Sequence, residues 1–141
     1  MENNHGYKIE NAMKKWFKGK NHPLDCVDFQ TKKSLYEVKS CRLFLECVNG
    51  NHKRAYTNKP HKKIRTTQMG RFFVKLDNHK KLRARAESEN KIPKYIFVVT
   101  IGKQKIWRVK SWEKINSIVR QRSKVTAVRI KDLFNETWED E

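Results

Sequence analysis

One run of seven residues constrains the fold more than any other part of the chain. It reads Tyr95-Ile96-Phe97-Val98-Val99-Thr100-Ile101, so it is almost wholly apolar and rich in β-branched side chains. A strand can be apolar at nearly every position only when both faces of its sheet are covered. The run therefore predicts a central strand that is buried on both faces.

The segments on either side of this run have the periods of helices and strands. Apolar residues at Ile9, Ala12, Met13, Trp16 and Phe17 recur at helical spacing, so we expect the chain to begin with a helix. Further strands are expected over residues 23–29, 35–40, 71–76, 105–110 and 125–130, and further helices over 78–90, 112–120 and 131–138. This order predicts an α/β fold with a mixed central β-sheet flanked by helices.

The length and charge of the chain narrow its class. A chain of 141 residues suits a single domain over residues 1–141, and 37% hydrophobic with 34% charged residues is a globular composition. Its 33 basic residues outnumber 15 acidic ones, which gives a formal net charge of +18. Because such an excess costs self-repulsion in the folded state, we expect a polyanionic partner, with nucleic acid first and a membrane surface second.

Other features bear on where the protein resides. No apolar run reaches the length of a membrane-spanning helix, and the first residues contain no apolar signal segment. We therefore expect a cytoplasmic protein with no segment in the membrane. The chain has three cysteines, Cys26, Cys41 and Cys47. Because their number is odd, we expect reduced thiols in place of a disulfide framework.

The strongest chemical signal lies in an expected hairpin, with Asp25 on its first strand and Glu37, Val38 and Lys39 on its second. Alternate side chains of a strand share a face, so Glu37 and Lys39 point the same way, roughly 7 Å apart. Two carboxylates can hold Mg²⁺, with the Val38 carbonyl as a further ligand. Lys39 can position or deprotonate the attacking water. This set predicts a site that cleaves phosphodiester bonds.

Two further acids bear on this site. Glu10 lies at the edge of the apolar stripe of the first helix, where a carboxylate is drawn towards the core boundary, so it is a third candidate ligand. Asp28 competes with Asp25, since both precede Glu37 at suitable separations. A turn centred on residues 32–33 would place Asp28 directly across from Glu37, whereas an earlier turn would bring Asp25 onto that face.

This arrangement resembles the PD-(D/E)xK nuclease superfamily, which includes type II restriction endonucleases, archaeal Holliday junction resolvases and phage exonucleases. The resemblance spans roughly residues 5–110 and rests on a helix with Glu10, a Pro-x-Asp25 element, a Glu37-x-Lys element, and the helix and strands that follow. The proline two residues before Asp25 resembles the family's usual motif, and it favours Asp25 over Asp28.

The resemblance implies a restriction-endonuclease-like core and a Mg²⁺-dependent DNA endonuclease, of the restriction or junction-resolving type, with Mn²⁺ as a substitute metal and no other cofactor. It implies that Asp25 and Glu37 bind the metal, that Lys39 is the catalytic lysine and that Glu10 is an accessory ligand. A homodimer is expected because one such domain cuts one strand. Two alternatives stay open: a nucleic-acid-binding module without catalysis, and a ribonuclease on the same fold.

A basic excursion over residues 47–76, read as a long loop or a set of hairpins, is the second signal. It holds no acidic residue, and its cations are interleaved with Tyr56 and His61, which suits phosphate contacts with occasional stacking. Gln68 and Arg71 are also expected at the edge of the active site. The expected nucleic-acid contacts are Lys53, Arg54, Lys59, Lys62, Lys63, Arg65, Gln68 and Arg71.

Overall fold

A four-stranded sheet forms the centre of the molecule. The computed structural model describes residues 4–48 and 65–134 of the chain. The strands of the sheet lie in the order β1 (Phe29–Gln30), β2 (Ser34–Arg42), β6 (Ile92–Ile101) and β7 (Gln104–Ser111). β6 runs parallel to β2, whereas β1 and β7 are antiparallel to their neighbours. The predicted mixed sheet is therefore confirmed.

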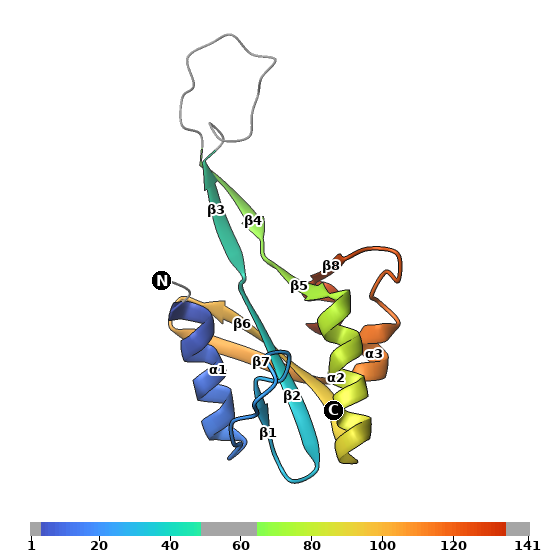
Figure 1. The fold of residues 1–141 in the computed structure, drawn as a ribbon. Helices are drawn as coiled ribbons and strands as arrows, with labels where there is room; N and C mark the ends of the chain where they lie inside the picture. The colour runs from blue at the N-terminus through green and yellow to red at the C-terminus, as the bar shows by residue number, and fades with distance from the viewer. Residues whose placement is uncertain (1–3, 49–64, 135–141) are drawn as a thin grey trace, which may run out of the picture.

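Helices cover both faces of this sheet. α1 (Asn4–Trp16) lies on one face, and α2 (Leu76–Glu89) and α3 (Trp112–Asn116) lie on the other (Figure 1). Because β2 and β6 are parallel, the chain must cross from the end of one strand to the start of the other, and α2 forms part of that connection. The α/β class predicted from the sequence is confirmed.

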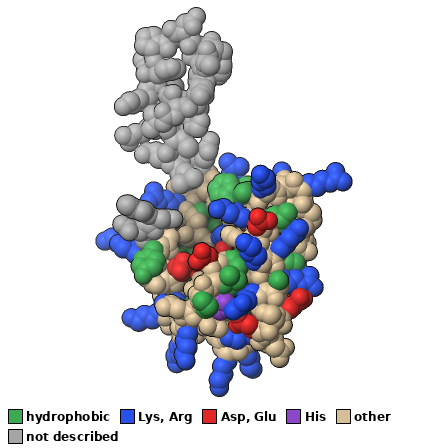
Figure 2. Space-filling view, in the orientation of Figure 1, with side chains coloured by type: hydrophobic (Ala, Val, Ile, Leu, Met, Phe, Trp, Pro, Cys, Tyr) green, Lys and Arg blue, Asp and Glu red, His purple; other side chains and the backbone are tan. Residues whose placement is uncertain are grey.

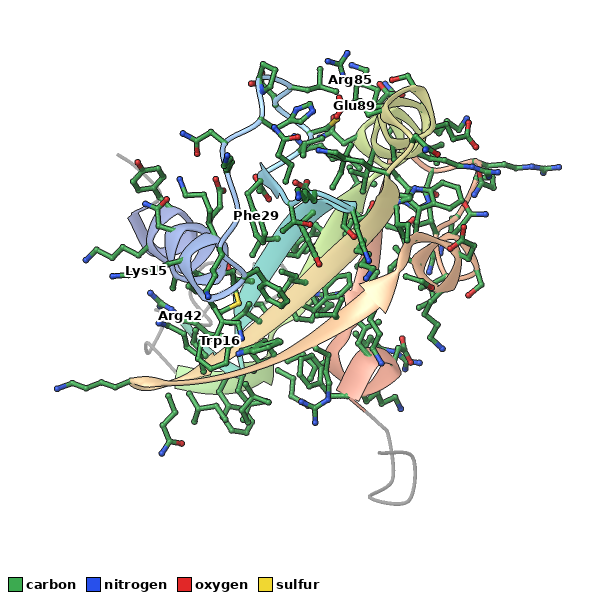
Figure 3. The ribbon with its side chains drawn as sticks, turned by 90° about the horizontal axis from the view of Figure 1, so that it is seen from below. Lys15, Trp16, Phe29, Arg42, Arg85 and Glu89 are labelled. Atoms are coloured by element: carbon green, nitrogen blue, oxygen red, sulfur yellow. The ribbon has the colours of Figure 1, made fainter. Side chains whose placement is uncertain are left out.

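β6 contributes side chains to two hydrophobic cores, one on each face of the sheet, as the apolar run predicts. Ile96 and Val98 pack beneath α1, whereas Tyr95, Phe97 and Val99 belong to the core beneath α2 and α3. All five side chains are buried, which explains why the run can be apolar without alternation. Figure 3 shows the sheet between α1 and the helices of the opposite face.

The first strand of the hairpin is shorter than predicted. β1 is only two residues long, although the sequence pattern predicts a strand over residues 23–29. The chain turns instead, and the Val27 N–H donates to the Leu24 carbonyl at 3.0 Å. Cys26 and Val27 are consecutive and yet both belong to the core beneath α2 and α3, whereas successive side chains of a strand point to opposite faces. Burial of this turn outweighs the strand propensity of its residues.

A two-stranded antiparallel ribbon projects from the sheet beyond the end of β2 (Figure 1). It consists of β3 (Phe44–Val48) and β4 (Arg65–Met69), which we call the arm. The chain returns from the arm into β5 (Arg71–Lys75), which pairs with β8 (Val125–Arg129) in a separate small sheet. The strands predicted over residues 71–76 and 125–130 are therefore confirmed.

The helices differ from the predictions mainly at their ends. α2 begins at Leu76, two residues before the predicted start, because the Leu76 N–H donates to the Lys124 carbonyl at 2.8 Å and needs no side-chain cap. α3 ends at Asn116 instead of residue 120, and α4 (Ile130–Phe134) follows β8 directly. None of the described helices is long and apolar enough to cross a bilayer.

A buried histidine organises the core beneath α2. His79 Nδ1 lies 2.7 Å from the Tyr95 hydroxyl, and His79 Nε2 lies 3.0 Å from Asn116 Oδ1. Because the Asn116 oxygen can only accept, Nε2 donates to it and Nδ1 accepts from Tyr95. The imidazole also stacks on Trp112 at 4.2 Å, with only 4° between the rings. Burial lowers the pKa of His79, so this group is a neutral structural residue.

Candidate active site

A cleft of about 420 Å³ beside β2 gathers all of the predicted catalytic and metal-binding residues. Its walls come from the first half of α1, from the loop before β1 and from the second half of β2. In the space-filling view, a small group of acidic side chains lies near the middle of one face, with Lys and Arg side chains around it (Figure 2). The cleft is lined by Gly6, Tyr7, Glu10, Asp25, Asp28, Glu37, Val38, Lys39 and Ser40.

Asp28 occupies the centre of this cleft. Phe29 pairs with Tyr36, the chain reverses between residues 31 and 34, and the Asp28 N–H donates to the Tyr36 carbonyl at 2.8 Å, so Asp28 lies beside Glu37. β1 does not extend the pairing further. The Asp28 carboxylate instead accepts the Val38 N–H at 2.6 Å, in the place that a backbone carbonyl would otherwise occupy. The turn is therefore the one that favours Asp28 over Asp25 as the neighbour of Glu37.

Three carboxyl groups form a hydrogen-bonded series, which we call the carboxylate cluster. Glu10 reaches Asp28 from α1, and Asp28 reaches Glu37 across the hairpin. An ionised carboxylate can only accept hydrogen bonds, so two carboxyl groups can bond each other only when one of them carries a proton. Three sequence-distant acids thus compete for protons at the open edge of β2.

The pKa values of two members reflect this crowding. Burial, followed by the charge of Glu37 and a hydrogen bond to it, raises the pKa of Asp28 to about 8. Burial, followed by the charge of Asp28, raises the pKa of Glu10 to about 7. Near neutral pH the cluster therefore retains protons that isolated carboxyl groups would lose. Strong shifts of this kind, inside a cleft, mark a candidate functional site.

Glu37 and Lys39 lie as the sequence predicts, on one face of β2. Lys39 Nζ is 3.1 Å from Glu37 Oε2, and the Glu37 side chain is buried while Lys39 keeps partial access to solvent. The ammonium group therefore lies within the cleft, next to the carboxylate cluster. A cation at this point can attract a phosphate group that enters the cleft.

Asp25 lines the cleft from the loop before β1 and is exposed. This loop is fastened to the far end of α2 by His22, whose Nε2 lies 2.8 Å from Glu89 Oε2. His22 Nδ1 accepts the N–H of Leu24 at 3.1 Å, which orients the ring. His22 is thus a structural residue, and it holds Asp25 at the rim of the cleft.

The donors of the carboxylate cluster are those that a hard divalent cation prefers. Mg²⁺ and Mn²⁺ favour carboxylate and carbonyl oxygens, and the cluster offers three carboxyl groups beside the backbone of Val38. Within the described ranges, however, no group of three or more His, Cys, Asp or Glu side chains is placed so that it could hold a metal ion. In the cluster, the acids bond one another and Lys39 instead.

Few of the predicted nucleic-acid contacts can be placed. Lys53, Arg54, Lys59, Lys62 and Lys63 lie outside the described residues. Arg65 and Gln68 belong to β4, but their side chains are also outside the described part. Arg71 is exposed on β5 and does not line the cleft.

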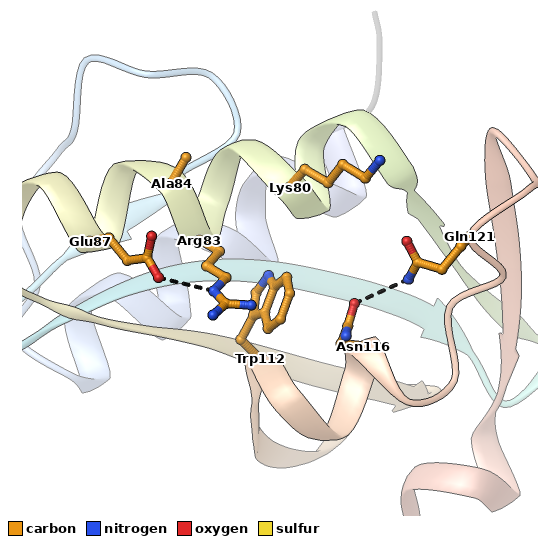
Figure 4. Close-up of a pocket in the computed structure, with 7 residues that line it drawn as sticks. All are labelled: Lys80, Arg83, Ala84, Glu87, Trp112, Asn116 and Gln121. Atoms are coloured by element: carbon orange, nitrogen blue, oxygen red, sulfur yellow. Dashed lines mark hydrogen bonds and ion pairs between the residues drawn. The ribbon is translucent and has the colours of Figure 1, made fainter.

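A second hollow, of about 540 Å³, lies between α2 and α3 (Figure 4). Four of its polar side chains form two pairs: Arg83 Nε lies 3.1 Å from Glu87 Oε2, and Gln121 Nε2 lies 3.2 Å from Asn116 Oδ1. Arg83 also covers the ring of Trp112 at 4.8 Å. Its lining contains a single carboxylate, so the cleft beside β2 is the better candidate for metal chemistry.

Three residues that line the cleft, Gly6, Tyr7 and Ser40, are absent from the sequence-based set. Tyr7 is 65% exposed at the mouth of the cleft, and its position three residues before Glu10 on a helix is a signal that could have identified it. Ser40 lines the cleft because β1 is too short to cover the edge of β2, and no sequence pattern reveals that.

Comparison with protein-family models, with curated proteins and with solved structures found no match to this chain. The function must therefore be argued from the cleft and its chemistry.

Proposed function

We propose that the protein is a Mg²⁺-dependent nuclease that hydrolyses phosphodiester bonds of DNA in the cleft beside β2. The observation that carries this proposal is the carboxylate cluster, in which Glu10, Asp28 and Glu37 converge from three elements, with Lys39 at 3.1 Å from Glu37. A bound divalent cation would activate a water molecule and neutralise charge on the phosphate. The wider arrangement, a helix and a hairpin followed by a helix and a parallel strand, supports a restriction-endonuclease-like core.

Each residue of the cluster has a distinct role in this proposal. Asp28 and Glu37 hold the cation, because Asp28 lies beside Glu37 across the hairpin and its side chain hydrogen-bonds to that of Glu37. Glu10 completes the set from α1, and the carbonyl of Val38 is a further ligand. Asp25 is exposed at the rim and orients water, in place of the direct ligation implied by the family resemblance.

Lys39 acts on the substrate and not on the cation. Lys39 lines the cleft, and 21% of its side chain is exposed to solvent. A lysine in this position donates hydrogen bonds to the scissile phosphate or to the attacking water. Glu37 fixes that ammonium group by the ion pair at 3.1 Å, so loss of Glu37 removes both a ligand and the support of Lys39.

The partner class follows from charge. A formal net charge of +18 suits a polyanion, and a strongly acidic cleft needs surrounding cations before it can accept a phosphate backbone. The homodimer expected from the family resemblance stays a prediction, which light scattering of the free protein tests.

Cleavage assays with matched variants test the proposal. Supercoiled plasmid, branched DNA and RNA are incubated with the protein in Mg²⁺, in Mn²⁺ or in EDTA. We expect metal-dependent nicking of DNA, which Glu37→Gln and Lys39→Ala each lower by at least about 100-fold while binding in EDTA persists. Exposed Asp77 in the first turn of α2 provides the control, since Asp77→Asn removes a carboxylate without touching the cleft.

The two competing aspartates are compared in the same assay. Asp28→Asn is expected to abolish nicking, whereas Asp25→Asn retains a measurable part of it, because Asp28 alone bridges to Glu37. Equal loss in both variants would show that Asp25 also binds the metal. Tight binding of DNA without cleavage in any metal would instead support the non-catalytic binding module, and cleavage restricted to RNA would support the ribonuclease.

A further inference from the structure

An apolar pair stands exposed at the base of the arm. Phe44 and Met69 lie directly opposite each other in the β3–β4 ladder, so their side chains share one face. They are 56% and 53% exposed, although both are large apolar residues. Isolated exposed apolar residues are common, but a paired set that continues into a hollow is typical of a binding surface.

The hollow beside this pair has a volume of about 360 Å³. Leu43 and Phe44 form one wall, and Thr100, Ile101 and Gly102 from the end of β6 form the other. Ile101 is itself 37% exposed, so the apolar surface extends from the arm onto the central sheet.

The base of the arm is held firmly to the sheet. The Leu43 N–H donates to the Thr100 carbonyl at 2.9 Å, and the Gly70 N–H donates to the Leu43 carbonyl at 3.0 Å. Gly70 is required there, because a Cβ at this position would lie 2.0 Å from the Arg42 carbonyl oxygen. The pair is therefore presented on a backbone that is fixed by hydrogen bonds, which favours a role in recognition.

The charges next to the pair indicate which partner it takes. Arg42, the last residue of β2, lines the hollow, and Arg71 begins β5 just after the arm. Both side chains are exposed. No acidic residue occurs in the sequence segments that form and flank the hollow, residues 42–44, 69–71 and 100–103. Apolar side chains flanked by cations are suited to bind a nucleic acid that has an unstacked base. The base can pack on the apolar side chains while the neighbouring phosphates contact the cations.

The pair lies a short way along the chain from the cleft. Ser40 lines the cleft and Phe44 follows four residues later, past a bend at residue 43, so the two backbone positions lie at most roughly 13 Å apart. Since stacked bases of one strand repeat every 3.4 Å or so, this span covers at most about four nucleotides.

We propose that Phe44 and Met69 form a wedge that packs against a nucleobase which has lost its stacking neighbour. Such bases occur at a branch point, a fork or a frayed end. In the bound substrate this base lies within about four nucleotides of the phosphate at the carboxylate cluster. The inference rests on the proposed function and deepens it, because it names branched or partly unpaired DNA as the substrate class. Intact duplex lacks the exposed base, so it meets only the cations and not the wedge.

Binding in EDTA tests the wedge without any need for cleavage. Forked DNA with 2-aminopurine at the branch point and the corresponding intact duplex are titrated with wild-type protein, Phe44→Ala, Phe44→Leu and Met69→Ala. Exposed Phe73 on β5 provides the control, since Phe73→Ala removes an aromatic ring of matching exposure, 55%, from another strand. Circular dichroism and thermal unfolding confirm that each variant is folded.

We expect wild-type protein to prefer the fork, and Phe44→Ala to lose about 10-fold in affinity for the fork but not for the duplex. Phe44→Leu retains the apolar surface and the fold but loses the aromatic contact with 2-aminopurine, so the fluorescence change on binding should shrink. Phe73→Ala should bind both probes as the wild type does.

Equal losses on fork and duplex, or no loss on either, would overturn the wedge. A wild-type dimer that becomes a monomer in Phe44→Ala would also overturn it, because the pair would then be an interface between two copies. A preference for forks that persists when Mg²⁺ produces no cleavage would refute the nuclease and leave the wedge standing. Mg²⁺-dependent cleavage with no preference for forks would refute the wedge and leave the nuclease standing.

Discussion

The carboxylate cluster makes a quantitative prediction about stability and pH. Burial and the charge of Glu37 raise the pKa of Asp28 from 3.8 to about 8, so the folded protein binds this proton more tightly than the unfolded chain does. The resulting stabilisation is complete below about pH 4 and is lost as the pH rises through about 8. Without metal, the free energy of unfolding should therefore fall between these limits.

The change Asp28→Asn isolates this effect. A shift of that size corresponds to an upper limit of about 6 kcal/mol above pH 8, at 1.36 kcal/mol for each pKa unit. Asparagine keeps an oxygen that accepts the Val38 N–H. However, a neutral hydrogen bond replaces an ionic one, so the stability gained by removing the buried charge is smaller than this limit. We expect the variant to be more stable than wild type by about 2–4 kcal/mol at pH 9, and by little at pH 5.

The assay is urea unfolding in EDTA, followed by tryptophan fluorescence from pH 5 to pH 9. Asp25→Asn is the matched control, because Asp25 lines the same cleft but is exposed, so its curve should run parallel to that of the wild type. Parallel curves for wild type and Asp28→Asn would refute the reasoning, since they would show that Asp28 is ionised without cost in the folded protein.

Three further changes test the parts of the fold that position the cleft. His22→Ala should lower the free energy of unfolding by about 1–3 kcal/mol and speed hydrogen exchange at residues 24–28, as measured by mass spectrometry, because it frees the loop before β1. His79→Leu leaves the buried Tyr95 hydroxyl unpaired and should cost about 2–4 kcal/mol in urea unfolding; a cost below about 0.5 kcal/mol would contradict the network. Gly19→Ala places a Cβ 2.2 Å from the Phe29 ring and should cost about 1–3 kcal/mol; an unchanged urea midpoint would argue against this close approach.

The spacing of apolar residues predicted those helices and strands whose buried face can be recognised from their own sequence. The apolar run at residues 95–101 is β6, and the helical stripe that includes Ile9 and Met13 is the face of α1 that covers it. Lys39 also lies beside Glu37 as the alternation of a strand requires. In each case a local pattern and the final packing agree, so the sequence alone was sufficient.

The identity of the acid opposite Glu37 could not be predicted with the same security. It depends on where the hairpin turns and on how far β1 extends, and a shift of one residue reverses the face of every side chain. The pattern over residues 23–29 favours a strand that would carry Asp25, yet burial of Cys26 and Val27 replaces it with a turn and brings Asp28 into the cluster. Tertiary packing, which no window of sequence reports, decides this point.

Metal binding linked to proton release tests the central claim most directly. With a pKa of about 8 for Asp28 and about 7 for Glu10, the cluster holds roughly one proton at pH 7.5, and a cation that binds there must displace it. Titration calorimetry of the free protein with Mn²⁺ or Mg²⁺, in two buffers of different ionisation enthalpy, counts that proton. We predict saturable binding with release of about one proton, and loss of both in Glu37→Gln. Absence of binding, or binding that releases no proton and survives Glu37→Gln, would contradict a metal site at the carboxylate cluster.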